Sequence, residues 1–191
     1  MYTTDTQKHK VFLIMGSTRP QRICEQIATW IKSLNDASSH IELELIDLRD
    51  SNLPMFDEPQ SPKMGNYTHA HTKAWAAKIN EAKGFIFLTP EYNAGYPSVL
   101  KNAIDFIYQE WKGKPTAIVS YGYSGGASAA KQLTEVFVRI GMDLVEPQAQ
   151  LIITQEMFNE QWLLKEPAEV FATQADGVKA TLTALAKAFV A

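Results

Sequence analysis

The chain contains three short apolar runs, each followed directly by a loop rich in glycine and polar residues. The runs and their loops are, in order, residues 11–15 with 16–20, 85–88 with 89–93, and 117–119 with 120–126. Continuous apolar runs are typical of central parallel strands that are covered on both faces. Since the carboxyl ends of parallel strands meet at one edge of a sheet, we expect the three loops to lie together, where open α/β sheets bind ligands.

Segments with apolar residues at helical spacing separate the strands. These helical patterns lie within residues 22–34, 69–82, 97–107, 130–140 and 171–189. An alternating pattern at residues 41–45 predicts an edge strand, and a last strand is expected within residues 143–153. Five strand and helix repeats predict an α/β fold with a doubly wound five-stranded parallel sheet, right-handed crossovers and helices on both faces.

Length and composition narrow the class of protein. The 191 residues suit a single domain over residues 1–191, in which residues 1–9 are expected to form a flexible polar lead-in. The formal net charge of -3 gives no basic field for nucleic acid or an anionic membrane surface. The polar start lacks a secretory signal pattern, and no run approaches the length of a membrane span. Cys24 is the only cysteine, so a reducing, cytoplasmic location fits best.

The first loop, Gly-Ser-Thr-Arg-Pro at residues 16–20, lies between a buried strand and a helix. Its backbone N–H groups and the helix N-terminus present positive potential, to which Ser17 and Thr18 add hydroxyl groups. Arg19 and Arg22 add charged planar donors suited to phosphate oxygens. The loop matches neither a P-loop nor the G-x-G-x-x-G pattern. It is a candidate anion cradle, and an ordinary helix cap with surface arginines is the alternative.

The second and third loops have the composition of a wall for a flat ring. Residues 90–97 combine two tyrosines, an amide and two prolines, which suit stacking and hydrogen bonding to a heteroaromatic ring. Residues 120–126 add glycines that allow close backbone approach and further donors. Each loop alone is equally consistent with a turn that covers the sheet edge. Three such loops at one edge favour a binding site.

Three other features have chemical and structural interpretations. Residues 49–68 contain three prolines and no sustained periodicity, and a loop this long is expected to cap the site or join a subunit interface. Cys24 stands alone near a helix start, which favours packing over a redox role. His69 and His71 do not share a helical face and have no carboxylate cluster nearby, so a solvated helix entry is favoured over a metal site.

Several short motifs in these loops and the adjoining helices form a recognisable set. They are Gly16-Ser17-Thr18-Arg19, Pro90-Glu91-Tyr92-Asn93 with Pro97, LKNAID at residues 100–105, Gly113-Lys114-Pro115, and Ser120-Tyr121-Gly122 with Gly125-Gly126. Together they resemble the NADPH-dependent FMN reductase family of flavodoxin-like proteins, which includes quinone, azo-dye and chromate reductases. The resemblance extends from about residue 10 to residue 141, and its most specific part is PEYN followed by LKNAID.

The resemblance implies FMN as cofactor and NADPH or NADH as reductant. It places the FMN phosphate on Ser17, Arg19 and the amides that lead into the helix at Arg22 and Ile23. The residues implied for the isoalloxazine ring are Pro90, Glu91, Tyr92, Asn93, Ser120, Tyr121, Gly122 and Gly125. Many relatives have a serine or threonine late in the first loop, where this chain has Arg22-Ile23-Cys24, so backbone and arginine contacts are expected there instead. The resemblance also implies a homodimer or homotetramer, and the apolar Met55, Phe56 and Tyr67 agree with this expectation.

The implied function is hydride transfer from NAD(P)H through flavin N5 to a quinone-like, flavin or other small electron acceptor, with no catalytic side chain and no metal. Tyr92, Asn93 and Tyr121 would position the ring. Two alternatives stay open. A flavodoxin-type electron carrier would be expected to have a strongly acidic docking surface, which the modest charge does not favour. A cofactor-free α/β interaction module would have kept only the fold.

Overall fold

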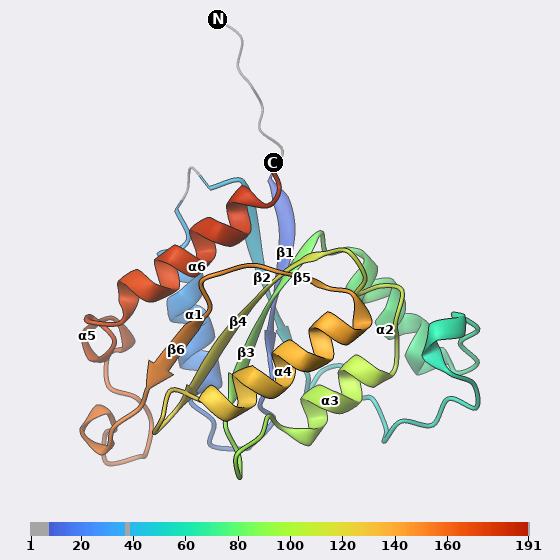
Figure 1. The fold of residues 1–191 in the computed structure, drawn as a ribbon. Coiled ribbons are helices and arrows are strands. Elements are labelled where there is room, and N and C mark those ends of the chain that lie inside the picture. Colours follow the sequence, from blue (N-terminus) through green and yellow to red (C-terminus); the bar gives the residue numbers. More distant parts are fainter. Residues whose placement is uncertain (1–7, 37–38, 191) are drawn as a thin grey trace, which may run out of the picture.

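The computed structural model describes residues 8–36 and 39–190, and a single parallel sheet forms its centre (Figure 1). Its strands within these residues are β1 (His9–Met15), β2 (Ile41–Asp47), β3 (Gly84–Pro90), β4 (Pro115–Gly122), β5 (Asp143–Leu144) and β6 (Ala149–Ile152). They lie in the order β2-β1-β3-β4, with β5 and β6 both beside β4. This is the flavodoxin-like doubly wound order, so the predicted fold class is confirmed.

The burial of each strand follows its sequence pattern. Every residue of β3 is buried, as is every residue of β1 from Val11 onward, because helices cover both faces. β2 lies at the edge and alternates between buried and more exposed positions at its start, as the alternating sequence predicts. The predicted lead-in, residues 1–9, falls mostly outside the described residues, and its last residue, His9, already belongs to β1.

The fifth position in the sheet differs from the expected continuous strand. β5 pairs with the first two residues of β4, and β6 pairs with Val119 to Gly122. Pro147 lies between the two segments and has no N–H to donate to a strand ladder. The interruption therefore has a local cause in the sequence.

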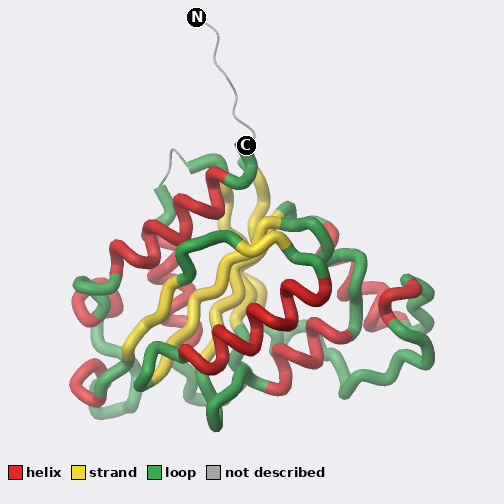
Figure 2. The backbone as a smooth tube through the Cα atoms, viewed as in Figure 1, coloured by secondary structure: helices red, strands yellow, loops and turns green. Residues whose placement is uncertain are grey.

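Helices form two layers, one on each face of the sheet (Figures 1 and 2). The described helices are α1 (Cys24–Leu34), α2 (Ala70–Asn80), α3 (Ser98–Asp105), α4 (Ala127–Ile140), α5 (Pro167–Val170) and α6 (Ala175–Lys187), with short 3-10 turns η1 (Pro62–Met64) and η2 (Gln155–Met157). α1 and α6 pack in one core, and α2, α3 and α4 pack in the other. The closing helix predicted within residues 171–189 is α6, which begins at Ala175, after the separate short helix α5. None of the described helices is long and apolar enough to cross a membrane.

The long loop before α2 is anchored on the α2 and α3 side of the molecule. The Phe56 N–H donates to Asn102 Oδ1 over 2.9 Å, and Tyr67 Oη donates to Glu110 Oε2 over 2.7 Å. Glu58 accepts hydrogen bonds from the backbone N–H groups of Thr68 and His69 at the start of α2. Figure 1 shows this loop (teal) at the side of the molecule opposite the segment after β6 (orange). A role in covering the candidate site of the same chain is therefore not supported.

Candidate functional site

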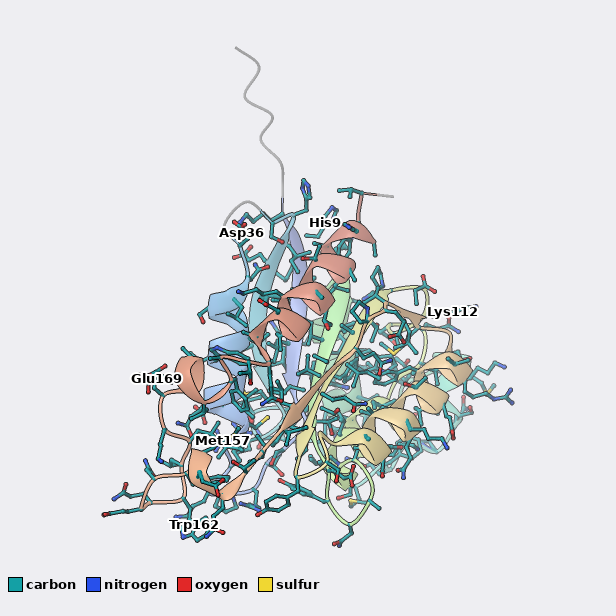
Figure 3. All side chains as sticks on the ribbon, turned by 60° about the vertical axis from the view of Figure 1, so that its left-hand side comes forward. His9, Asp36, Lys112, Met157, Trp162 and Glu169 are labelled. Atoms are coloured by element: carbon teal, nitrogen blue, oxygen red, sulfur yellow. The ribbon has the colours of Figure 1, made fainter. Side chains whose placement is uncertain are left out.

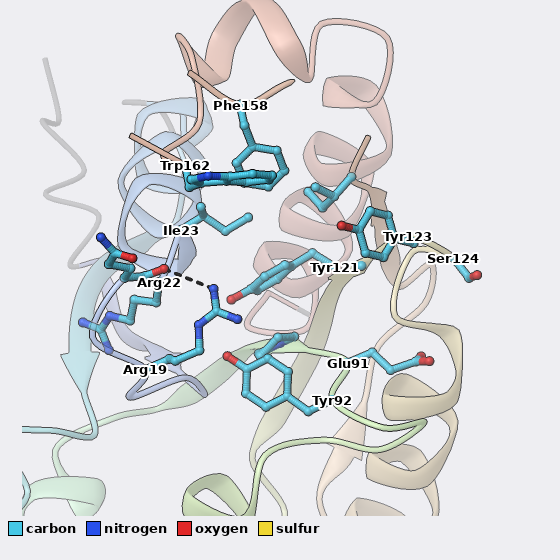
Figure 4. A pocket seen from close by; sticks show the side chains of 14 residues that line it. Arg19, Arg22, Ile23, Glu91, Tyr92, Tyr121, Tyr123, Ser124, Phe158 and Trp162 are labelled. Carbon is cyan, nitrogen blue, oxygen red and sulfur yellow. Dashed lines mark hydrogen bonds between the residues drawn. The ribbon is translucent and has the colours of Figure 1, made fainter. Parts of the chain in front are cut away.

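A cavity of about 510 Å³ opens at the carboxyl edge of the sheet. Figure 3 shows this end of the molecule with Trp162, opposite the end where His9 begins β1. The structure brings together most of the residues that the sequence nominated. Those lining the cavity are Arg19, Arg22, Ile23, Pro90, Glu91, Tyr92, Tyr121 and Gly122 (Figure 4). The three loops thus meet at one site, as their position after parallel strands predicted.

The first loop passes close to β3 and is connected to the second loop. The Gly16 N–H donates to the Leu88 carbonyl over 2.8 Å, and a Cβ at Gly16 would lie 2.9 Å from that oxygen. Ser17 is fully buried, with its Oγ 2.7 Å from Tyr92 Oη. Ser17 therefore lies beneath the cavity wall and positions Tyr92, while its hydroxyl is outside the cavity lining.

Arg22 has a different role from the one its charge suggested. Its side chain is only 1% exposed, and its guanidinium donates to both carboxylate oxygens of Asp47 and to the Ser17 carbonyl. Burial raises the pKa of Asp47, but hydrogen bonds from Arg22 and Arg49 outweigh it and hold this pKa well below its usual range. The guanidinium of Arg22 is thus engaged inside the protein, which corrects the expectation that it is free to bind phosphate.

Arg19 and the start of α1 remain available to an anion. Arg19 is exposed, and Figure 4 shows its guanidinium inside the cavity with a hydrogen bond to the Gln21 carbonyl of 3.3 Å. Ile23 occupies the N-cap of α1 and supplies no capping hydrogen bond. The first backbone bond of this helix runs from Ile27 N–H to the Ile23 carbonyl, so the preceding amides have no acceptor within the helix. These are the donors that bind anions at helix N-termini.

The second loop is held in place by Glu91. Its carboxylate accepts hydrogen bonds from Ser128 N–H at 2.9 Å and Ala129 N–H at 3.4 Å, at the start of α4. Its own N–H donates to the Tyr121 carbonyl over 3.1 Å, which joins the second loop to the third. Glu91 lines the cavity, but its charge is directed to the helix N-terminus.

Asn93 lies outside the cavity lining, at the tip of a tight turn. Two backbone hydrogen bonds between Tyr92 and Gly95 close this turn. Asn93 and Ala94 have φ values of 50° and 61°, in the left-handed region, which asparagine tolerates better than most residues. Within the single chain, Asn93 therefore shapes the loop that presents Tyr92.

Two residues nominated in the third loop also act below the surface of the cavity. Ser120 is fully buried and its Oγ donates to the Gly125 carbonyl over 2.7 Å. Gly125 and Gly126 have φ values of 68° and 72°, and a Cβ at Gly126 would lie 2.8 Å from the Ser120 Cβ. The glycines and Ser120 thus fix the turn, and the neighbouring Tyr121 faces the ligand space.

Tyr121 lines the inner wall of the site, and the fully buried Cys24 lies behind it, outside the cavity lining. Burial and the neighbouring Cys24 raise the pKa of Tyr121 well above its usual value. Burial also raises the pKa of Cys24 to about 11, despite a hydrogen bond with Tyr121. The thiol stays protonated near neutral pH, which agrees with the packing role expected for Cys24.

Six lining residues were not among the nominated ones. They are Gln21, Tyr123, Ser124, Ile153, Phe158 and Trp162. Tyr123 and Ser124 belong to the third loop, whose composition had already indicated a site. Phe158 and Trp162 follow β6 in a segment with no periodic signal, and only the folded chain brings them beside the first loop.

Comparison with known proteins places these features in a family. Residues 9–156 match the model of the NADPH-dependent FMN reductase family. A 129-residue stretch is 51% identical to an NAD(P)H-dependent FMN reductase of Schizosaccharomyces pombe. The stretch covers 66% of this chain and 64% of that protein, so the match spans just under two thirds of the relative's length. A quinone reductase of Pseudomonas putida is 29% identical over 87% of this chain and 90% of its own length.

A solved structure supports the fold over nearly the whole chain. The flavoenzyme NAD(P)H:(acceptor) oxidoreductase of Paracoccus denitrificans superposes with a TM-score of 0.71 at 22% identity, covering 94% of this chain and 98% of the other. The family match spans β1 to β6 and all three loops of the cavity. The chain belongs to the NADPH-dependent FMN reductase family.

Proposed function

We propose that this protein is an FMN-dependent oxidoreductase that transfers hydride from NAD(P)H to a quinone-like, flavin or other small electron acceptor. The observation that carries the proposal is the cavity at the carboxyl edge of the sheet, which combines an anion-binding corner with aromatic and backbone walls. Two of the relatives are named as an NAD(P)H-dependent FMN reductase and a quinone reductase, which supports the same activity.

The anion-binding corner fits the phosphate of FMN. Arg19 offers an exposed guanidinium, and the amides at the start of α1 have no capping side chain. Ile23 lies at this helix start and lines the cavity. We assign the phosphate to Arg19 and to the backbone around Arg22 and Ile23, with Ser17 supporting the loop from below.

The aromatic and backbone walls fit the ring of FMN. Pro90 and Tyr92 of the second loop and Tyr121 and Gly122 of the third loop all line the cavity. Their positions are set by buried hydrogen bonds in the second and third loops, so the walls are largely preformed. Glu91, Asn93, Ser120 and Gly125 complete the proposed site by fixing the loops that carry these walls.

The chemistry of the lining residues leaves the reaction to the cofactor. When bound, FMN would supply hydride acceptance from NAD(P)H and reduction of the acceptor. Cys24 is buried and protonated, and the Glu91 carboxylate caps α4, so neither is suited to act as a nucleophile or base. The residues of the chain bind, orient and partly shield the ligand.

Two experiments test this function. In the first experiment, purified protein is loaded with FMN and mixed with NADPH or NADH in a stopped-flow instrument in the absence of oxygen. The absorbance of the oxidised flavin should fall, and addition of a quinone should restore it. Bleaching on a catalytic timescale separates a reductase from an electron carrier of flavodoxin type. A protein that binds no FMN would instead support a cofactor-free module.

The second experiment tests the phosphate assignment. Arg19→Ala should raise the Kd for FMN about ten- to a hundredfold, because a hydrogen bond to a charged group contributes about 1.5–3 kcal/mol. Riboflavin, which has no phosphate, should bind both proteins equally. Arg139→Ala, in the last turn of α4, is the matched control and should leave the Kd unchanged. Equal losses for FMN and riboflavin would contradict the assignment.

We further propose a single-domain, cytoplasmic protein that forms a homodimer or homotetramer. Met55 is 78% exposed and Phe56 is 42% exposed on the long loop, and such apolar side chains are typical of subunit interfaces. Light scattering of the purified protein should give a mass of two or four chains. Met55→Asp should reduce this mass if the loop forms the interface.

A further inference from the structure

The segment after β6 places two aromatic side chains at the cavity. Phe158 and Trp162 line it from the side across from Tyr92, as Figure 4 shows. Their rings are 5.9 Å apart between centroids and inclined by 50°. Trp162 is 61% exposed, whereas Trp30, Trp75 and Trp111 are buried in the two cores. A large exposed indole at the mouth of a cavity has apolar surface available to a ligand.

The backbone holds Trp162 in an unfavourable conformation. Its φ is 59°, in the left-handed region that few non-glycine residues adopt. Asn159 maintains the turn, because its Oδ1 accepts from the N–H groups of Gln161 and Leu163 at 3.0 and 3.1 Å. The Trp162 N–H also donates to the Asn159 carbonyl over 3.1 Å. These hydrogen bonds hold the turn, and its tryptophan nevertheless stays 61% exposed.

The turn is also fixed to the scaffold of the site. The side-chain amide of Gln26, on α1, donates to the Leu164 carbonyl over 2.9 Å and accepts from the Leu164 N–H over 3.0 Å. The Leu164 side chain is buried in the core that includes α1. A bidentate contact of this kind sets the position of the turn relative to the first loop. The aromatic pair is therefore held at the cavity before any ligand arrives.

The family match ends at residue 156, so both aromatic residues lie just beyond it. The loops within the match carry the contacts assigned above to FMN, and the aromatic pair faces the same space from the opposite side. We propose that Phe158 and Trp162 form a stacking wall that binds the electron acceptor and gives this chain a preference for flat aromatic acceptors over acceptors without a ring. This proposal rests on the proposed function for the identity of the ligand as an acceptor.

The test compares Trp162→Ala with Leu163→Ala, its exposed neighbour, which does not line the cavity. In FMN-loaded protein, Trp162→Ala should raise the KM for 1,4-naphthoquinone about three- to tenfold, because it removes one aromatic stacking contact. Trp162→Phe should recover most of the loss. Reduction of ferricyanide, which has no ring, should be unchanged in all variants.

Other measurements identify outcomes that would overturn the proposal. If Trp162→Ala slowed the reduction of naphthoquinone and ferricyanide equally, the aromatic pair would serve the fold and not the acceptor. A higher Kd for FMN in this variant would assign the pair to cofactor binding. Slower flavin reduction at low NADPH would assign it to binding of the reductant. A lower mass by light scattering with unchanged naphthoquinone kinetics would assign Trp162 to a subunit interface.

Calorimetry of naphthoquinone binding without reductant separates this proposal from the proposed function. Weaker binding in Trp162→Ala than in Leu163→Ala supports the wall even if NAD(P)H fails to reduce the flavin. If Trp162→Ala and Leu163→Ala bind naphthoquinone equally and NAD(P)H still reduces the flavin, the proposed stacking wall is wrong and the reductase function stands.

Discussion

The two sides of the cavity are built in different ways. On the side of the three loops, the polar groups are largely used within the protein: Arg22 with Asp47, Glu91 with the start of α4, and Ser120 with Gly125. On the other side, Trp162 exposes most of its surface on a turn that Asn159 holds. The first side gains its shape from buried bonds, and the second offers surface to a ligand.

This difference separates residues that define the site from residues that adjust it. Substitutions on the first side should change the stability of the fold and cofactor binding together, because the bonds that hold the loops are also bonds within the core. Substitutions on the second side should change ligand preference with little change in stability. Four predictions test this division, from the largest expected effect on the free energy of unfolding to the smallest.

Asp47→Ala should lower the free energy of unfolding by about 3–5 kcal/mol, because it removes the carboxylate that binds the buried guanidinium of Arg22 through both oxygens and leaves only the exposed Glu25, at 3.5 Å. Urea denaturation measures the change. Asp176→Ala is the control, since Asp176 is 95% exposed in its pair with Lys179 and should cost less than about 0.5 kcal/mol. A similar small change for Asp47→Ala would show that the first side is not held by this pair.

The same pair should make stability sensitive to acid. The pKa of Asp47 is lowered in the folded protein, because hydrogen bonds from Arg22 and Arg49 outweigh the effect of burial. Its contribution is therefore present above the unfolded pKa of about 3.9 and is lost as the pH falls below that value. Urea midpoints should converge for wild type and Asp47→Asn as the pH is lowered below about 4. A constant difference between them would contradict the lowered pKa.

Glu91→Ala should lower the free energy of unfolding by about 0.5–2 kcal/mol, because the amides at the start of α4 lose their acceptor. Glu91→Gln keeps an acceptor oxygen and should lose less. Thermal and urea unfolding give the comparison. If Glu91→Ala weakened FMN binding strongly at unchanged stability, Glu91 would act on the ligand directly and the division between the two sides would fail there.

Trp162→Ala should change the free energy of unfolding by less than about 0.5 kcal/mol, because the side chain is mostly exposed. The left-handed backbone at this position gives no reason for tryptophan to stabilise the turn. Urea denaturation alongside Leu163→Ala provides the measurement. A loss of about 2 kcal/mol would show that the aromatic pair belongs to the scaffold as well.

The fold was predictable because its signals are local. The apolar runs that became β1, β3 and β4 are buried on both faces, and the alternating run that became β2 lies at the edge. The interruption between β5 and β6 and the late start of α6 were not predicted. The interruption falls at Pro147 and the helix start falls after a separate short helix, α5, and hydrophobic spacing alone reports neither.

The site was predictable to the level of its loops and less so to the level of single side chains. Parallel strands bring their carboxyl ends together, which is why Arg19, Tyr92 and Tyr121 meet at one cavity. The sequence could not show that Arg22 is engaged by Asp47, since the two are far apart along the chain and each looks like a surface residue by type. It gave no sign of Phe158 and Trp162 for the same reason.

The order of strands and helices, the edge that carries the ligand site and the loops that form it were determined by the sequence itself, because hydrophobic periodicity and glycine positions act over a few residues. Tertiary structure alone decided which charges are buried in pairs, which are exposed at the cavity, and that an aromatic pair after β6 faces the three loops. These outcomes depend on contacts between segments distant in the chain, where burial and partner geometry determine what each side chain can do.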